Sequence, residues 1–355
     1  MPSASCHLLA CVEFPEQDLV RGESPVSVAR IGAAMLLVAT GWWSVASAAS
    51  PEYRLLDHAL IEQIWDVAAK RFIDRDTLAR ELARADYVLL GETHDNPQHH
   101  EHQAWAIEQL LKVGRKPPVA FEMITPPQLA KLPASGELTA DRLFDLLDWD
   151  NSGWPDRSYY RPLFETVLAA GLPVRAANLE RAELRGLIQR GSAGLPADVA
   201  ELLQRVTLSE QDAAGLRQEI ADSHCGALPT QQVDGLSLGQ RVRDAVMARA
   251  LVEARSEHGA VLIAGNGHVR SDRGAPAYVR AADPQRRLRS LAWQEVREEM
   301  PVPNDYAAVW AAPSLPFDFV WFTARVARPD PCETFREHMR QMAAPSASGE
   351  KAKSP

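Results

Sequence analysis

Three short segments of the chain contain side chains that can bind a metal ion or transfer protons. The first, "LLGETHDNPQHHEHQ" (89–103), contains Glu92 and His94 directly after an apolar run. The second, "FEM", contains Glu122, and the third, "GNGH", contains His268. Two imidazoles and two carboxylates can hold a divalent transition metal and leave a coordination position open. The same groups can also act as a general base and a general acid without a metal.

Two chemical interpretations and one structural interpretation follow from these residues. A Mn, Co or Zn ion held by Glu92, His94 and His268 would lower the pKa of bound water to roughly 7, as in a metal-dependent hydrolase, with Glu122 as a further acid. Alternatively, the four side chains form a polar network that only ties one loop to another. The segment "GNGH" lacks the glycine spacing of a dinucleotide site. No GxSxG nucleophile motif occurs in the chain.

The remaining histidines are weaker candidates. His100 continues the apolar face of the helix expected after residue 96, so it either reaches the same crevice or lies in the core. His99 and His102 are expected to be solvated. His224 precedes Cys225 and a turn, and it is interpreted as a ligand, a helix cap or a residue without a role.

Short apolar strands position these groups. Strands are expected at 85–91, 118–123, 172–178 and 260–265, with a helix from Asn96-Pro97 to about Val113. Strands that alternate with helices predict a mostly parallel sheet that is flanked by helices on both faces. Each candidate group follows the carboxyl end of a strand, where parallel sheets form their sites. We therefore expect the four groups to meet at one edge of the sheet.

The chain after the N-terminal region is expected to form two domains and a tail. An α/β domain is expected over 50–178 and 236–340, with further helices at 139–148, 162–170 and 238–257 and further strands within 288–296 and 317–325. A helical subdomain is expected at 179–235, since no strand pattern interrupts it. The segment 149–161 is expected to be an aromatic loop, and 341–355 a disordered tail.

The N-terminal region is expected to direct export. An apolar run ends in small residues, and Ala46-Ser47-Ala48 has the form of a signal-peptidase site. We therefore expect residues 1–49 to be a signal-peptide region, within which 1–25 is interpreted as a misassigned start, and the mature protein to be periplasmic or secreted. Leu8-Leu9-Ala10-Cys11 only loosely resembles a lipidation site, so membrane association is an alternative.

Composition and cysteine content limit the remaining options. The 355-residue chain is 46% hydrophobic and carries a net charge of −9 without a basic cluster, which argues against nucleic acid as a partner. Cys225 and Cys332 are the two cysteines outside the predicted signal region. A disulfide between them is the expectation for an oxidising compartment, and two free thiols are the alternative.

Five motifs, in this order, give the chain a family resemblance. They are "LLGETHDNPQHH", "FEM", "GLPVRAANLER", "HCGALP" and "VLIAGNGHVR". Together they resemble the ChaN-like haem-binding uptake proteins, which share a superfamily with Tiki-type metalloproteases and erythromycin esterases. The resemblance covers about 85–280. It implies a parallel α/β domain with a smaller helical domain, and an exported protein of bacterial iron acquisition.

The resemblance also implies a ligand and a mode of assembly. Members of the family hold two stacked haems between two protomers, with a tyrosine on the iron, so it implies a homodimer and a link to outer-membrane uptake machinery. Tyr159 or Tyr160 would be the iron ligand here, and Arg161 or His224 would meet a propionate. His100 is a further contact candidate.

Two alternatives stay open beside haem binding. Tiki-type relatives carry two G-x-x-H motifs that bind a metal, and Gly91-Glu92-Thr93-His94 and Gly265-Asn266-Gly267-His268 fit that pattern. A metal-dependent hydrolase is therefore the second hypothesis. A non-catalytic protein that binds another small ligand is the third.

Overall fold

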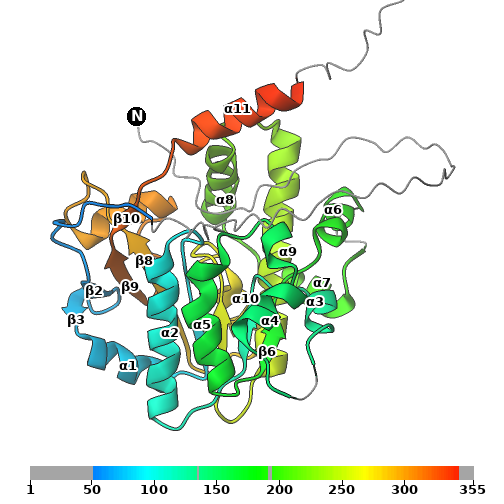
Figure 1. Ribbon diagram of the computed structural model, residues 1–355. Coiled ribbons are helices and arrows are strands. Elements are labelled where there is room, and N and C mark those ends of the chain that lie inside the picture. The colour runs from blue at the N-terminus through cyan, green and yellow to red at the C-terminus, as the bar shows by residue number, and fades with distance from the viewer. Residues whose placement is uncertain (1–50, 134–135, 191–193, 344–355) are drawn as a thin grey trace, which may run out of the picture. The chain divides into compact units, whose positions relative to one another are not determined.

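The computed structural model describes residues 51–133, 136–190 and 194–343, and its centre is an eight-stranded sheet (Figure 1). The strand order is β3-β2-β9-β8-β4-β7-β5-β6. The six strands from β9 to β6 pair in parallel, and β2 pairs antiparallel with β9 and β3. The strand bounds are β2 Ile64–Asp66, β3 Arg71–Ile73, β4 Tyr87–Leu90, β5 Val119–Phe121, β6 Val174–Ala176, β7 Ala260–Ile263, β8 Leu288–Glu295 and β9 Phe319–Thr323. A separate two-stranded ladder joins β1 Tyr53–Arg54 to β10 Arg325–Val326.

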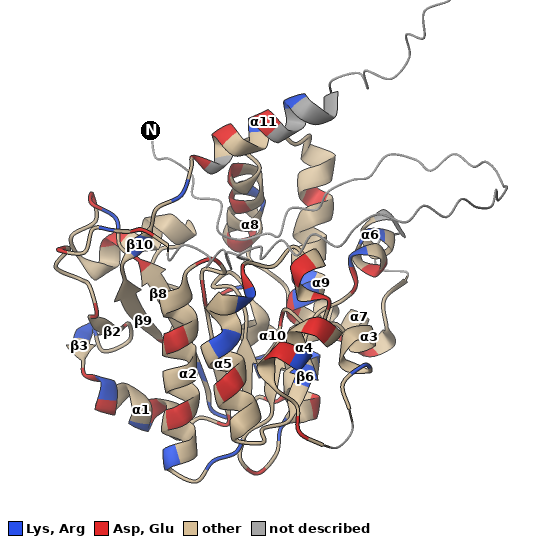
Figure 2. Cartoon of the chain, viewed as in Figure 1, with Lys and Arg blue, Asp and Glu red and all other residues tan. Residues whose placement is uncertain are grey.

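Helices cover both faces of the sheet. Their bounds are α1 Arg75–Ala83, α2 Pro97–Lys112, α3 Pro126–Leu129, α4 Ala140–Leu146, α5 Arg157–Ala169, α6 Arg181–Arg190, α7 Ala197–Arg205, α8 Glu210–Ser223, α9 Thr230–Ala254, α10 Ala275–Ala282 and α11 Pro331–Ala343, with 3-10 turns at Trp149–Asn151 and Pro303–Trp310. Helices α2 and α5 lie side by side on one face, and α9 and α10 lie on the other (Figure 1). In this view, acidic and basic residues are both distributed over these elements (Figure 2).

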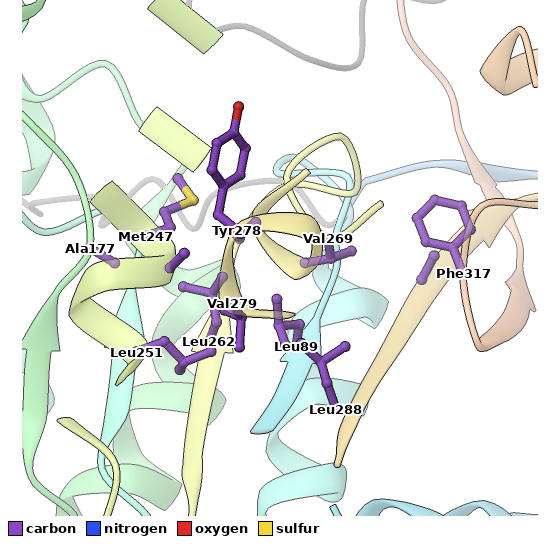
Figure 3. Packing of buried hydrophobic residues seen from close by; sticks show 14 of the residues in the cluster. Leu89, Ala177, Met247, Leu251, Leu262, Val269, Tyr278, Val279, Leu288 and Phe317 are labelled. Atoms are coloured by element: carbon purple, nitrogen blue, oxygen red, sulfur yellow. The ribbon is translucent and has the colours of Figure 1, made fainter. Parts of the chain in front are cut away.

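The two faces of the sheet form two hydrophobic cores. Along β4, Tyr87 and Leu89 belong to one core, and Val88 and Leu90 to the other, because successive side chains of a strand point to opposite faces. Figure 3 shows the first core, in which Met247 and Leu251 of α9 and Tyr278 and Val279 of α10 lie beside Leu262 of β7. Every residue of β4 and β7 is buried, as expected for central parallel strands.

The predicted fold class is confirmed, and the differences are local. The strands expected at 85–91, 118–123, 172–178 and 260–265 are β4, β5, β6 and β7. Strands β2 and β3 were not predicted, because three residues each are too few to show a period. Helix α5 begins at Arg157 rather than at 162, because Asp156 accepts a hydrogen bond from the Ser158 amide and caps the helix five residues earlier.

Helices alone occupy the chain between β6 and β7 in the part that the structure describes. The predicted disulfide is confirmed: Cys225, in the turn between α8 and α9, bonds to Cys332 at the start of α11. None of the described helices combines the length and the apolar character that a membrane span requires. The predicted signal region (1–49) and the tail beyond Ala343 lie outside the described residues.

Candidate functional site at the carboxyl edge of the sheet

The loops that follow β4, β5 and β7 bring the four principal candidates together. The Asn266 amide donates to the Glu92 carbonyl at 2.8 Å, which holds the loop after β7 against the loop after β4. The side-chain amide of Asn178, which follows β6, donates to the Glu122 carbonyl at 2.8 Å. These two contacts fix the loops at one edge, as the strand pattern predicted.

Glu92 and His94 form the first carboxylate–imidazole pair. The His94 Nδ1 lies 2.7 Å from Glu92 Oε1, and the Tyr160 hydroxyl donates to the same oxygen at 2.6 Å. Glu92 is fully buried, whereas 17% of the His94 side chain is exposed. Burial alone would raise the pKa of Glu92, but His100 and His94 outweigh it and hold that pKa below its ordinary value. Glu92 is therefore an ionised carboxylate that orients His94.

His268 and Asp244 form a second pair of the same kind. Asp244 Oδ1 lies 2.6 Å from His268 Nδ1, and both side chains are buried. Burial acts to lower the pKa of His268, yet the carboxylates of Glu122 and Asp244 raise it to about 9. Burial raises the pKa of Asp244 to about 6. At neutral pH the pair is therefore an imidazolium beside a carboxylate.

Glu122 lies between the two pairs. Its Oε2 lies 3.9 Å from His94 Nε2, and its Oε1 lies 3.4 Å from His268 Nε2. Arg243 of α9 donates to Oε1, and the Gly265 amide donates to Oε2 at 2.7 Å. Burial opposes ionisation of Glu122, but His268 and Arg243 hold its pKa well below the ordinary value. Both imidazoles thus present Nε2 to one ionised carboxylate.

The expected metal site is not supported. Among residues 51–133, 136–190 and 194–343, no three His, Cys, Asp or Glu side chains gather in a way that could hold a metal ion. Arg243 supplies the reason, since its guanidinium binds the Glu122 carboxylate that would have to bridge His94 and His268. A divalent cation and a guanidinium compete for the same oxygens.

Three histidines of α2 are buried, which corrects the expectation that His99 and His102 are solvated. His99 accepts the Thr93 amide at 2.8 Å, and burial lowers its pKa well below the ordinary value. His102 stacks on Trp321 with a centroid distance of 4.3 Å. His100 donates to the His94 carbonyl at 2.9 Å, and its Nδ1 lies 3.1 Å from Glu92 Oε2. His100 therefore helps to hold both members of the Glu92–His94 pair in place.

The sequence predicted that Tyr159 and Tyr160 lie in a loop, but both lie on the first turn of α5. Tyr160 is fully buried, and its hydroxyl is bound to Glu92. Burial and the Glu92 charge raise its pKa well above the ordinary value, so it remains a protonated donor. Tyr159 is half-buried, and burial followed by the charges of Asp156 and Asp95 raises its pKa. The two neighbours therefore have different chemical roles.

The predicted propionate contacts are engaged elsewhere. Arg161 lies on the outer side of α5, where it binds Asp141 at 2.5 Å and lies 3.6 Å from Glu165. His224 ends α8, and its Nδ1 donates to the Ile220 carbonyl at 2.8 Å. In the part of the chain that the structure describes, neither side chain is bonded to the two carboxylate–imidazole pairs.

Sequence reasoning missed the contribution of α9. Gln240, Arg243 and Asp244 are buried on the face of α9 that meets His268 and Glu122. An available signal was the charged pair Arg243-Asp244 in a segment that is otherwise apolar for two turns, because buried charges require partners.

Several solved structures match parts of this chain. A structure of ChaN of Campylobacter jejuni with cofacial haem binding matches with a TM-score of 0.58 and 21% identity, covering 74% of this chain and 96% of that one. An erythromycin esterase EreC mutant in its open conformation matches with a TM-score of 0.33 and 16% identity, over 71% and 79%. A Bacillus cereus protein matches with a TM-score of 0.36 and 12% identity, over 71% and 92%. No curated protein sequence matches this chain.

The family model agrees with the motifs and with the fold. The model described as "Haem-binding uptake, Tiki superfamily, ChaN" matches residues 78–279, which include β4, the two carboxylate–imidazole pairs and all of α9. That match extends over more than half of the chain. The chain therefore belongs to the ChaN family of haem-binding uptake proteins within the Tiki superfamily.

Proposed function

We propose that this protein binds haem at the carboxyl edge of the sheet, with Tyr159 as the iron ligand. The single observation that carries the choice of ligand is the contrast between Tyr159 and Tyr160. Among the described residues, the Tyr159 hydroxyl has no hydrogen-bond partner and its ring is half-buried, whereas Tyr160 is enclosed and bound to Glu92. An iron ligand must be reachable, and Tyr159 is accessible whereas Tyr160 is enclosed.

Partly exposed aromatic side chains beside the site fit a flat aromatic ligand. Trp154 lies edge-on to His94 at a centroid distance of 5.0 Å, and Trp154, Tyr159 and His94 are all partly exposed. We call these three residues the aromatic rim. Rings of this kind pack on a porphyrin through stacked and edge contacts. Bound haem would supply the iron, while the rim would provide the apolar surface and Tyr159 the anionic oxygen.

A haemin titration of three proteins tests this proposal. The wild type and Tyr160→Phe should shift the Soret band of haemin, and Tyr159→Phe should lose the charge-transfer absorbance of a phenolate on ferric iron. Tyr160→Phe is the matched control because the two substitutions remove the same atom from adjacent positions. A wild type that leaves the haemin spectrum unchanged would refute haem binding, and an unchanged Tyr159→Phe would refute the choice of ligand.

The wider role that we propose is iron acquisition outside the cytoplasm. Support comes from the family match and from the A-x-A sequence at Ala46-Ser47-Ala48. The same proposal includes export by cleavage near residue 48, a homodimer that encloses haem, and delivery from or to outer-membrane uptake machinery. Amino-terminal sequencing of protein from the periplasm tests the cleavage site. Sedimentation with and without haemin tests the dimer, and a mass that stays that of one chain would exclude it.

A second candidate function is hydrolysis by acid–base catalysis without a metal. The observation that favours it is the geometry of the pairs: Glu92 and Asp244 each orient an imidazole through Nδ1, and both Nε2 atoms point to Glu122. A carboxylate that holds Nδ1–H leaves Nε2 to move a proton. His94 is partly exposed and can take a proton from water, while Glu92 stabilises the resulting charge.

The pH dependence of ester hydrolysis tests this candidate. Burial acts to lower the pKa of His94, but Glu122 and Glu92 outweigh burial and raise this pKa above its ordinary value. The imidazole would therefore act as a base only at a pH above that raised pKa. With p-nitrophenyl acetate, the rate should rise with pH through that raised pKa and should be lost in His94→Ala. Tyr159→Phe is the control, since it leaves the pair intact. Hydrolysis that persists in His94→Ala would refute the assignment.

A further inference from the structure

A hollow with a basic lining lies at the opposite edge of the sheet from the aromatic rim. It has a volume of about 390 Å³ and is lined by Glu81, Arg84, Ala85, Arg287 and Arg289. Ligand pockets in proteins begin at about 300 Å³, so a small ion with its hydration shell fits. The hollow and the aromatic rim have no residue in common.

The pairing of two parallel strands creates this hollow. Tyr87, the first residue of β4, pairs with Leu288, the first residue of β8. Arg287 immediately precedes β8, and Arg84 caps the end of α1 three residues before β4, so both residues lie near the amino ends of neighbouring strands. Helix α1 ends at Ala83 and contributes Glu81 to the lining (Figure 2 shows the charges of α1).

The charges of the lining do not balance. Glu81 is shared by two guanidiniums, since Arg84 Nη1 lies 3.0 Å from Oε1 and Arg289 Nη2 lies 3.2 Å from Oε2. Across the described ranges, the Arg287 guanidinium has neither a hydrogen bond nor an ion pair, although its backbone amide donates to Asp86. Three cations and one carboxylate leave a charge of +2 on the lining. In a chain with a net charge of −9, this local excess is opposite in sign to the whole.

Nearby acids outside the lining have partners of their own. Asp86 lies 3.7 Å from Arg286 and accepts the Arg287 amide. Asp318 accepts hydrogen bonds from Ser290 at 2.8 Å and 3.2 Å, and it lies 3.9 Å from Arg289. The guanidinium of Arg287 is thus left as the group without an acceptor. Guanidinium forks bind oxyanions through two parallel N–H bonds.

We propose that this hollow binds a phosphate-type oxyanion, held by Arg84, Arg287 and Arg289. A phosphate carries about −1.5 to −2 charges at neutral pH, which matches the lining. Its tetrahedral oxygens can accept from guanidiniums that approach from several directions, whereas a planar carboxylate offers two acceptors in one plane. The source of the phosphate is either a soluble phosphate or the headgroup of a phospholipid.

The test uses the full mature protein and inorganic phosphate, with chloride keeping the ionic strength constant. Calorimetric titration should show one phosphate per chain, and Arg287→Gln should weaken binding at least tenfold. Arg142→Gln is the matched control, because it removes the same charge from an exposed site on α4. Arg287→Gln should fold normally, since this side chain holds no partner. No binding to the wild type, or equal losses in the two variants, would overturn the proposal.

Vesicles then distinguish the two sources. If the natural ligand is a headgroup, the protein should sediment with vesicles that contain phosphatidic acid but not with pure phosphatidylcholine, and Arg287→Gln should abolish this. If the ligand is soluble, inorganic phosphate should bind while both vesicles leave the protein in solution. Haemin titration of Arg287→Gln should match the wild type, so the failure of this proposal is separable from the failure of haem binding.

Discussion

Tyr160→Phe removes one buried hydroxyl and thereby tests how the site is held together. The hydroxyl donates to Glu92 Oε1 at 2.6 Å, in a place where neither side chain reaches water. Because the acceptor is ionised, a hydrogen bond of this kind contributes about 1.5–3 kcal/mol. After the substitution, Glu92 would keep His94 at 2.7 Å and His100 at 3.1 Å, so the carboxylate would stay paired.

The expected loss for Tyr160→Phe is therefore about 2 kcal/mol. For a chain of this size, one kcal/mol corresponds to about 2 °C in melting temperature, so Tm should fall by about 4 °C. Tyr159→Phe removes a hydroxyl that has no partner in the described structure and should change the free energy of unfolding by less than about 0.5 kcal/mol.

Urea unfolding followed by circular dichroism measures both free energies. The m-value should be equal in the two variants, since neither changes the surface exposed on unfolding. The reasoning would be refuted if Tyr159→Phe lost as much stability as Tyr160→Phe, or if Tyr160→Phe were as stable as the wild type. The first result would mean that the Tyr159 hydroxyl has a stabilising partner, and the second would mean that the Tyr160 hydroxyl does not support the Glu92 carboxylate.

Three further predictions concern the same region and the helical segment. The pKa of His268 is raised to about 9, so its contribution to stability should be fully present below pH 6.5 and lost as pH rises towards 9, by up to about 3 kcal/mol. Urea unfolding at pH 6.5, 8 and 9.5 measures this loss, and in His268→Gln the free energy of unfolding should depend less on pH. Replacing Cys225 and Cys332 by Ala should cost about 3 kcal/mol, and reductant should lower the Tm of the wild type but not of the variant. Gly265→Ala would place a methyl 2.9 Å from His94 Nε2 and push the imidazole away from Glu122. The pKa of His94, measured by NMR, should therefore fall towards its ordinary value while the fold persists. An unchanged pKa would contradict the geometry around Glu122.

Much of the fold was predictable because central strands carry a strong signal. Apolar runs such as "YVLL" and "AVLI" are buried on both faces, and the polar groups after them mark their carboxyl ends. This placed Glu92, Glu122 and His268 at one edge correctly. The short strands β2 and β3 carried no such signal, since β3 has no buried residue.

The parts of the site that escaped prediction are contacts between distant segments. Asp244 binds a histidine 24 residues away, and Tyr160 binds a glutamate 68 residues away. Sequence spacing cannot reveal which side of a helix meets which loop. His99 and His102 looked polar and exposed, yet α2 buries both. The His99 ring is hydrogen-bonded to Thr93 and Thr323, and the His102 ring stacks on Trp321.

The bond between Cys225 and Cys332 sets an order of events during synthesis. One partner lies 107 residues after the other, at the start of the last described helix, so the ribosome must have passed residue 332 before the two sulfurs can meet. Until then, the turn between α8 and α9 is held only by non-covalent contacts. A copy of the protein that is kept in a reducing compartment would not form this disulfide. The reduced and the oxidised chain would then differ by one covalent bond, which gel mobility without reductant can detect.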